Sequence, residues 1–291
     1  MDFKTTPLFE VHKKLGAKTA PFGGYLMPIQ YKGIIEEHNW TRTNCSIFDI
    51  CHMGEFILQG DAKNSNLESI VTFSLESMPQ GACRYGFMLN ENGSIIDDLI
   101  VYRIDEEEWM LVVNAATESK DEAHIKKNLS WDAHFKNISS TIAKLDLQGP
   151  ESGNVLSKIV GDKIKALKYY TFSDFLINGE EYLVSRTGYT GELGYEIYAG
   201  FGHVEKLWNM FLEDKRVQPA GLGARDTLRL EMGYSLYGQD IDETVSPLSL
   251  ASSKFIDFDK DFIGKDALLE IKKSGIESKL ICFKTISRRA P

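Results

Sequence analysis

The sequence contains few residues that could cross-link the chain or hold a metal. Its 291 residues include four cysteines, at positions 45, 51, 83 and 282, and no Cys-x-x-Cys pair. The six histidines are dispersed, without His-x-x-x-His or His-Glu-x-x-His spacing. A disulfide-dense secreted scaffold is therefore excluded, metal catalysis is not expected, and free thiols in a reducing cytosol are predicted.

Basic charge and long apolar runs are also scarce. Asp and Glu number 42 against 33 Lys and Arg, which leaves a formal net charge of −9. A chain this acidic does not attract nucleic acid or an anionic membrane surface. No stretch approaches the ~20 apolar residues of a membrane-spanning helix, and residues 1–6 do not resemble a targeting leader. We therefore expect a cytoplasmic protein that binds neither nucleic acid nor membrane.

The composition is that of a globular protein with a sizeable core. Apolar residues make up 43% of the chain and charged residues 26%, which excludes intrinsic disorder and collagen-like repeats. Because domains usually have about 100–200 residues, the length predicts two or three lobes.

Hydrophobic periodicity predicts a mixed fold. Apolar residues at helical spacing cover 3–20, 34–42, 64–71, 119–129, 152–159, 203–212 and 223–232. Strand-like runs cover 46–50, 56–60, 84–89, 95–102, 109–114, 182–186 and 195–198, with a turn composition at 90–93. Successive strands followed by a helix are typical of an antiparallel sheet with helices on one face. The predicted fold class is α+β, with antiparallel sheets and helices in two intimately packed lobes.

Two adjacent carboxylates, Asp97 and Asp98, lie inside the apolar run 95–102. Side chains alternate between the two faces of a strand, so the two should point in opposite directions. Burying an ionised carboxylate is costly unless hydrogen bonds or opposite charges compensate it. The pair is therefore either a well-partnered structural feature or a functional one, and spacing alone leaves both readings open.

The segment 186–196 contains three glycines within seven residues, at positions 188, 191 and 194. Glycine permits positive φ and close approach of the backbone to a ligand. The segment has acidic residues and no lysine, so it matches neither a P-loop nor a dinucleotide fingerprint. Glutamates beside such a loop suit a neutral ring with N–H donors, such as a pterin or purine. A plain hairpin between strands is the alternative.

The segment 221–231 has the pattern of a helix entry and places Arg225 and Arg229 on one helical face. We expect one of them to bind a ligand carboxylate and the other to pair with an acidic side chain. His52 follows Cys51, but no third group nearby could orient the two for thiol catalysis.

Several motifs occur in an order that resembles one family. They are Phe22-Gly23-Gly24, Glu37-His38, Phe48–Gly54, Gly93–Leu99, Leu147–Pro150, Arg186–Glu192, Gly223–Asp226, Tyr237–Glu243 and Asp261–Lys265. Each is weak by itself, but their unbroken order along nearly the whole chain is specific. The sequence is similar to the aminomethyltransferase family, the T-proteins of the glycine cleavage system.

The resemblance implies an enzyme, a tetrahydrofolate-dependent aminomethyltransferase that needs no metal. Members of the family take the aminomethyl group from the lipoyl arm of H-protein and pass its carbon to tetrahydrofolate. Ammonia and 5,10-methylenetetrahydrofolate result. The implied partners are lipoylated H-protein and tetrahydrofolate, with the folate in a central funnel between the lobes. Residues 1–50 with 140–245 are the predicted first lobe, and residues 51–139 the second.

The resemblance also assigns site residues. Asp98 would be the catalytic carboxylate, which stabilises an iminium-like transition state and positions the reacting groups, while Asp97 would face the other way. Glu196 would bind the N–H edge of the pterin, and Arg225 the distal part of the folate. The other predicted folate-binding residues are Met53, Tyr85, Tyr102, Asn114, Tyr189 and Tyr234.

The sequence departs from the family pattern in three places. Cys51 replaces the usual Ser before His-Met-Gly, and Leu193 replaces the usual Asp after Gly-Glu. The family continues past an Arg-Arg-Ala-Pro segment into a C-terminal β-barrel lobe, whereas this sequence stops at Pro291. We therefore expect residues 246–291 to be a connecting segment and the third lobe to be largely absent. The funnel would then lack one of the lobes that surround it in the family.

Three other functions remain open. Sister enzymes on the same scaffold use tetrahydrofolate to accept carbon from dimethylglycine, sarcosine or dimethylsulfoniopropionate, and they differ mainly at the donor site. A folate-binding protein without turnover would resemble the iron–sulfur maintenance relatives, whose cysteine motif is missing from residues 186–196. A truncated protein that folds without turnover is the third.

Overall fold

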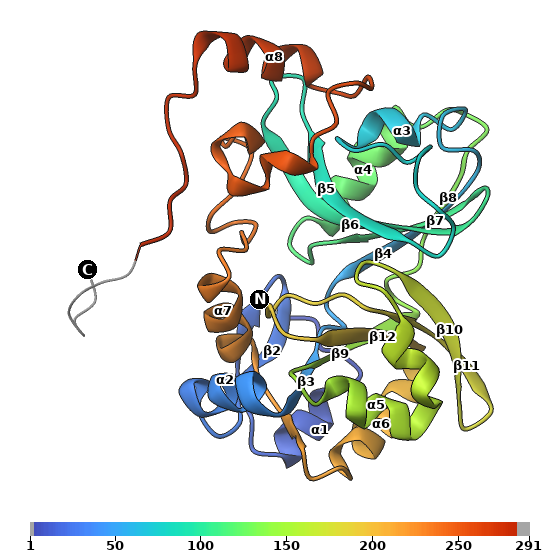
Figure 1. The fold of residues 1–291 in the computed structure, drawn as a ribbon, viewed down its shortest axis with the longest axis vertical. Coiled ribbons are helices and arrows are strands. Elements are labelled where there is room, and N and C mark those ends of the chain that lie inside the picture. Colours follow the sequence, from blue (N-terminus) through green and yellow to red (C-terminus); the bar gives the residue numbers. More distant parts are fainter. Residues whose placement is uncertain (1–2, 284–291) are drawn as a thin grey trace.

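The computed structural model describes residues 3–283, which form two lobes stacked one above the other (Figure 1). The lower lobe contains a two-stranded and a six-stranded sheet, and the upper lobe a five-stranded sheet. None of the sheets in the described part of the chain closes into a barrel. The predicted α+β class with antiparallel sheets is confirmed.

The six-stranded sheet has the strand order β10–β11–β12–β9–β3–β13. Its strands are β3 (Cys45–Asp49), β9 (Ile142–Gln148), β10 (Phe172–Ile177), β11 (Glu180–Ser185), β12 (Gly194–Gly200) and β13 (Val217–Pro219). All neighbours are antiparallel except β13 and β3. The chain leaves this sheet after β3 and returns at β9, so the upper lobe is an excursion between two paired strands.

This sheet has one apolar and one polar face because its central strand alternates. The odd-numbered residues of 143–147 share a hydrophobic core with α5 (Ser152–Val160) and α6 (Phe201–Leu212). The even-numbered residues, Lys144, Asp146 and Gln148, are also buried, but they point to the opposite face. The polar face turns away from the helices and toward the upper lobe.

The five-stranded sheet of the upper lobe has the order β5–β6–β7–β4–β8, with all neighbours antiparallel. Its strands are β4 (Gly54–Gln59), β5 (Cys83–Leu89), β6 (Ile95–Asp105), β7 (Glu108–Val113) and β8 (His134–Asn137). One face packs against α3 (Leu67–Ile70) and α4 (Glu118–Asn128). The helix predicted over 64–71 is shorter because Asn66 adopts a left-handed φ of 66° directly before it.

The N-terminal region is a helix followed by a hairpin, so the prediction of one helix over residues 3–20 is wrong. The helix α1 spans only Phe9–Lys14, and β1 (Lys18–Phe22) pairs with β2 (Tyr25–Gln30). Gly23 and Gly24 have φ of 55° and 85°, as a two-residue hairpin turn requires at both central positions. The two glycines therefore form the turn of a hairpin within the N-terminal region. The next helix, α2 (Ile34–Thr43), packs against α7 (Leu222–Glu231).

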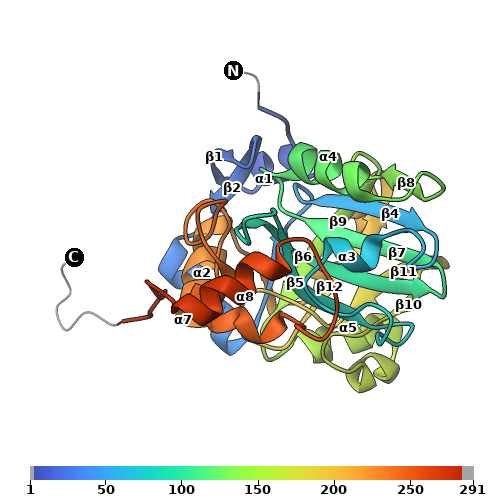
Figure 2. The ribbon, with the colours of Figure 1, turned by 90° about the horizontal axis from the view of Figure 1, so that it is seen from above.

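The chain after α7 returns to the upper lobe. It forms 3-10 turns at Pro247–Ser249 and Ala251–Phe255 and the helix α8 (Lys265–Ser274); an earlier 3-10 turn spans Asp162–Ala166. Leu248 and Leu268 share a core with Phe87 of β5. Figure 1 shows α8 at the top of the molecule, at the end of the β5–β6 hairpin, and Figure 2 shows it beside β5. This part of the predicted connecting segment is thus packed onto the upper lobe. The predicted lobe boundaries stay a prediction, and the Arg288–Pro291 motif lies outside the described residues.

Candidate functional site

A cavity of about 940 Å³ lies between the two lobes. Its walls come from the polar face of the lower sheet, from β6 of the upper sheet and from the segment 222–255. A volume of this order accommodates a small-molecule substrate or cofactor. The predicted site residues that line it are Met53, Tyr85, Asp98, Asn114, Tyr189, Glu196, Arg225 and Tyr234.

Asp98 faces the cavity from β6, whereas its neighbour Asp97 is fully buried. Tyr85 Oη donates to Asp98 Oδ2 at 3.0 Å, and Asn114 Nδ2 donates to Asp98 Oδ1 at 2.9 Å. Asp97 accepts from the backbone N–H of Asn114 at 3.1 Å and from the Thr117 hydroxyl at 2.8 Å. Asp97 therefore anchors the connection from β7 to α4, and Asp98 presents its carboxyl to the cavity.

The surroundings of Asp98 disfavour its charged form. Burial and the neighbouring Asp97 raise the pKa of Asp98 to about 7, although the hydrogen bonds from Tyr85 and Asn114 oppose the shift. Both donors are neutral, so they orient the carboxyl without supplying a positive charge. Near neutral pH this group can therefore exchange a proton, as expected of a reactive carboxyl.

A second carboxylate, Glu196 of β12, lies on the polar face of the lower sheet. The Thr187 hydroxyl donates to its Oε2, and Lys144 Nζ on β9 lies 3.7 Å from its Oε1. Burial opposes ionisation, but Lys144, Thr187 and Arg225 outweigh it and lower the pKa of Glu196. Both Glu196 and Lys144 line the cavity, so a ligand there meets an ionised carboxylate.

Tyr102 lies behind this carboxylate and is not among the residues that line the cavity. It shares a face of β6 with Asp98 but lies further along the strand, where it packs on Phe172 and the lower sheet. Its hydroxyl lies 3.4 Å from Glu196 Oε2 and 2.9 Å from the Tyr198 hydroxyl. Tyr102 therefore lies next to Glu196, and its predicted contact with folate stays a prediction.

The two arginines of α7 are both paired inside the protein. Arg225 Nη1 forms an ion pair with Asp146 of β9, and its guanidinium lies 5.1 Å from the centroid of the Tyr189 ring. Arg229 is nearly buried and pairs with Asp240. Arg225 is the more exposed of the two, so it is the better placed to contact a ligand, and Asp146 already balances its charge.

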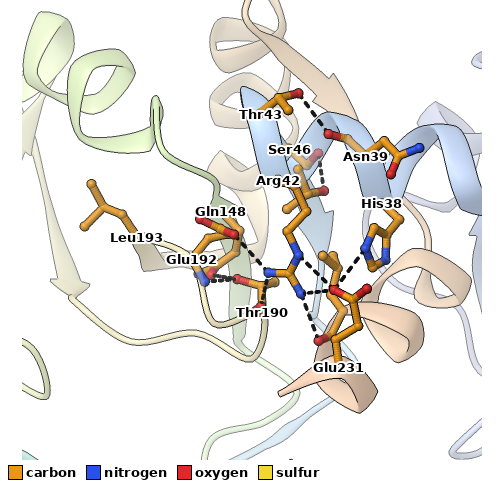
Figure 3. A network of polar contacts seen from close by, with 12 residues as sticks. His38, Asn39, Arg42, Thr43, Ser46, Gln148, Thr190, Glu192, Leu193 and Glu231 are labelled. Carbon is orange, nitrogen blue, oxygen red and sulfur yellow. Dashed lines mark hydrogen bonds and ion pairs between the residues drawn. The ribbon is translucent and has the colours of Figure 1, made fainter. Parts of the chain in front are cut away.

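The glycine-rich segment forms a loop that Arg42 of α2 holds in place (Figure 3). Arg42 Nη1 donates to the backbone oxygen of Thr190 at 2.6 Å and to Glu192 Oε1 at 3.0 Å. Its Nη2 donates to Glu231 Oε2 of α7 at 2.8 Å. Arg42 thus fixes the loop between two helices, and the loop's Tyr189 lines the cavity.

The departures from the family pattern at positions 51 and 193 lie outside the cavity lining. The Cys51 thiol is buried and donates to the backbone oxygen of Lys144 at 3.4 Å. Leu193 packs against the core of the lower lobe and points away from the Arg42 network in Figure 3. Neither side chain therefore alters the cavity directly.

Sequence reasoning missed Lys144, Asp146 and Arg42. The first two had a signal, because residues 143–148 alternate between apolar and polar, as is typical of a strand with one polar face. No local pattern marks Arg42, because its hydrogen-bond partners lie far away in the sequence, at 190–192 and 228–231. His52, mentioned only beside Cys51, also lines the cavity, and burial lowers its pKa to about 3. His52 is therefore neutral.

Known proteins match this chain over nearly its whole length. Residues 8–260 match the family model of the GCVT N-terminal domain. The aminomethyltransferase of Halothermothrix orenii is 44% identical, over 99% of this chain and 82% of its own length. That of Caldanaerobacter subterraneus is 42% identical, over 100% of this chain and 79% of its own. The chain belongs to the aminomethyltransferase family.

A solved structure agrees with this assignment. The glycine cleavage system aminomethyltransferase T from Bartonella henselae has a TM-score of 0.88 at 34% identity, covering 94% of this chain and 76% of that one. The predicted function, that of a glycine cleavage aminomethyltransferase, is confirmed by this membership. Among residues 3–283, no helix is both long and apolar enough to cross a membrane, and no cluster of three His, Cys, Asp or Glu could hold a metal ion.

Proposed function

We propose that this aminomethyltransferase takes its carbon from the aminomethyl-lipoyl arm of H-protein and transfers it to tetrahydrofolate in the cavity between the lobes. Ammonia, 5,10-methylenetetrahydrofolate and dihydrolipoyl H-protein are the products, and the reaction takes place in the cytoplasm. One observation supports this most strongly. Asp98 and Glu196 line a single cavity from different lobes, one with its pKa raised and the other with its pKa lowered.

Glu196 holds the pterin in this proposal. A pterin carries N–H donors along one edge, and an ionised carboxylate is the strongest acceptor for such donors. Tyr189 and Tyr234 stack with their ring centroids 5.8 Å apart beside Arg225. This side of the cavity receives the distal part of the folate.

Asp98 acts where the carbon is transferred. The carbon–sulfur bond to the lipoyl arm and the carbon–nitrogen bond to the amine break, and two carbon–nitrogen bonds to N5 and N10 of the folate form. The two protons that N5 and N10 lose go to the departing sulfur and to the amine, which leaves as ammonia. Positive charge develops on the carbon in an iminium-like transition state, and the Asp98 carboxylate stabilises it. Tyr85 and Asn114 hold the carboxylate in position.

A tetrahydrofolate titration paired with an ammonia-release assay on aminomethyl-loaded H-protein tests the proposal. Wild type and Asp98→Asn should bind folate with similar affinity, whereas the variant should release ammonia about 10²–10³-fold more slowly. Asp105→Asn, at the exposed end of the same strand, should behave like the wild type. Folate binding without release by the wild type would contradict this donor and point to a sister enzyme. No folate binding would overturn the role of the cavity.

A further inference from the structure

Lys144 is a buried lysine whose N–H groups form no hydrogen bond within the described part of the protein. Its side chain is 1% exposed, and it lies on the polar face of β9, where it lines the cavity. Its Nζ lies 3.7 Å from Glu196 Oε1, beyond hydrogen-bond distance, and 5.3 Å from the centroid of the Tyr198 ring. Within residues 3–283, Nζ donates no hydrogen bond to another side chain or to the backbone.

These donors face the cavity, where an acceptor on a ligand can reach them. An ammonium carries three N–H donors, and a buried charged group needs hydrogen bonds as well as an opposite charge. Lys260, a second largely buried lysine, shows the usual solution, because its Nζ donates to the backbone oxygens of Val71 and Phe73. Lys144 has no such acceptors, and its free donors can be satisfied by an acceptor on a ligand in the cavity.

We propose that Lys144 and Glu196 together recognise the lactam edge of the bound ring, and this rests on the proposed function. Glu196 accepts from a ring N–H, and Lys144 donates to the carbonyl oxygen next to that N–H. The 3.7 Å between Lys144 Nζ and Glu196 Oε1 places a donor beside an acceptor, which is the complement of an adjacent N–H and C=O. Lys144 is thus a specificity residue for the 4-oxo form of the folate.

The same pair rejects a ring in which an amino group replaces the carbonyl. The amino group of such a ring carries N–H donors, and so does the Lys144 ammonium, so no hydrogen bond forms between them. The ring nitrogen next to the amino group also carries no N–H from which Glu196 could accept a hydrogen bond. A site that binds a polar group by hydrogen bonds discriminates strongly against an analogue that lacks it. A mere counter-ion for Glu196 would not distinguish the two rings in this way.

Dissociation constants for tetrahydrofolate and its 4-amino analogue test the proposal. Wild type should prefer the 4-oxo ligand by at least about tenfold. Lys144→Met should weaken binding of the 4-oxo ligand about 10–100-fold and change binding of the 4-amino analogue by less than about threefold. Lys260→Met also removes a largely buried ammonium, but one outside the cavity lining, and it should keep the wild-type ratio.

An equal loss for both ligands in Lys144→Met would overturn the proposal and leave Lys144 as a counter-ion for Glu196. Unchanged binding of both would overturn it as well. If Lys144→Met does not fold, Lys144→Gln retains an N–H donor and should give an intermediate ratio. The wild-type ratio needs no variant, and equal or tighter binding of the 4-amino analogue would refute the proposal. Wild type that binds neither ligand would instead refute the proposed function.

Discussion

The carboxyl groups on the two walls of the cavity have neighbours of different charge. On the lower wall, Glu196 lies beside Lys144, and Asp146 pairs with Arg225. Burial and the nearby Glu196 still raise the pKa of Asp146 to about 6, so Glu196 is the lower-wall carboxyl that contrasts with Asp98. On the upper wall, Asp98 lies beside a second carboxyl, Asp97, and its donors are neutral. Burial alone would raise the pKa of both groups, yet the pKa of Glu196 is lowered and that of Asp98 is raised.

This difference shows that the neighbours decide what a buried carboxyl can do. Lys144, Thr187 and Arg225 keep Glu196 ionised, which suits steady recognition of N–H groups. A carboxyl beside another acid and neutral donors changes its charge near neutral pH, which suits a group that responds to charge developing during a reaction. We therefore assign binding to the lower wall and chemistry to the upper wall.

The largest effect on binding should come from Glu196→Gln. The variant keeps the shape of the side chain but removes its charge, and it leaves Lys144 without its counter-ion. A hydrogen bond to a charged group contributes about 1.5–3 kcal/mol, so tetrahydrofolate should bind about 10–150-fold more weakly. The rate at saturating folate should change by less than about threefold.

The control for this change is Glu181→Gln, an exposed glutamate on β11 of the same sheet. It should leave both folate affinity and the rate of ammonia release unaltered. A Glu196→Gln variant that binds folate normally but turns over slowly would reverse the assignment of the two walls.

The next effect is the pH dependence of Asp98. If the ionised carboxylate is the active form, ammonia release at saturating substrates should rise about tenfold between about pH 6 and about pH 8, since the pKa of Asp98 is raised to about 7. Glu196 is ionised throughout this range, so folate affinity should change far less. A flat rate profile in the wild type would contradict the role of Asp98.

Stability should change with pH in the opposite direction. The pKa of Asp98 in the folded state, about 7, exceeds the value of about 3.9 in an unfolded chain. The folded state therefore holds this proton more tightly, and the stability it contributes is lost as pH rises through about 7. In denaturant titrations, Asp98→Asn should gain stability relative to wild type at about pH 8.5 and not at about pH 4. An equal difference at both values would argue against the raised pKa.

The two walls differ in how well the sequence predicts them. The Asp97–Asp98 pair is visible in the sequence because two charges interrupt an apolar run, and alternation correctly separates their directions. Lys144 and Asp146 stand in an equally regular pattern, but a strand with alternating charges is usually read as facing solvent. Only the packing of the upper lobe over this face, which the sequence does not specify locally, reveals that both are buried.

The errors in the fold have local causes. The helical periodicity of residues 8–15 hides the hairpin at Gly23-Gly24, because it extends the predicted helix over the first strand of that hairpin. Tyr102 lies on the predicted strand and face, but four residues from Asp98 the lower sheet covers that face. In both cases the element type was easier to predict than where the element ends or what covers it.

A smaller effect should come from Arg42, which supports the lower wall from outside. Arg42→Ala releases Thr190 and Glu192 from α2 and breaks the link from α2 to Glu231 of α7. The loop that carries Tyr189 should then move. We expect folate affinity to fall about 3–10-fold with the rate at saturation nearly unchanged. Arg216→Ala removes a comparable ion-pair cluster with Asp214 and Glu151, in the same lobe but outside the cavity lining. Equal losses in the two variants would indicate a general loss of stability instead.

The smallest effect should come from Tyr102→Phe, which removes the hydroxyl behind Glu196. The contact is long, 3.4 Å to Oε2, and Thr187 still donates to the same oxygen, so folate should bind only about two- to threefold more weakly. Tyr198→Phe is the matched control, because its hydroxyl donates to Tyr102 and not to Glu196. Both variants should lower the melting temperature, since each breaks the same buried hydrogen bond, but only Tyr102→Phe should alter folate affinity. A loss of tenfold or more in Tyr102→Phe would mean that this side chain contacts the ligand directly, as the sequence alone predicts.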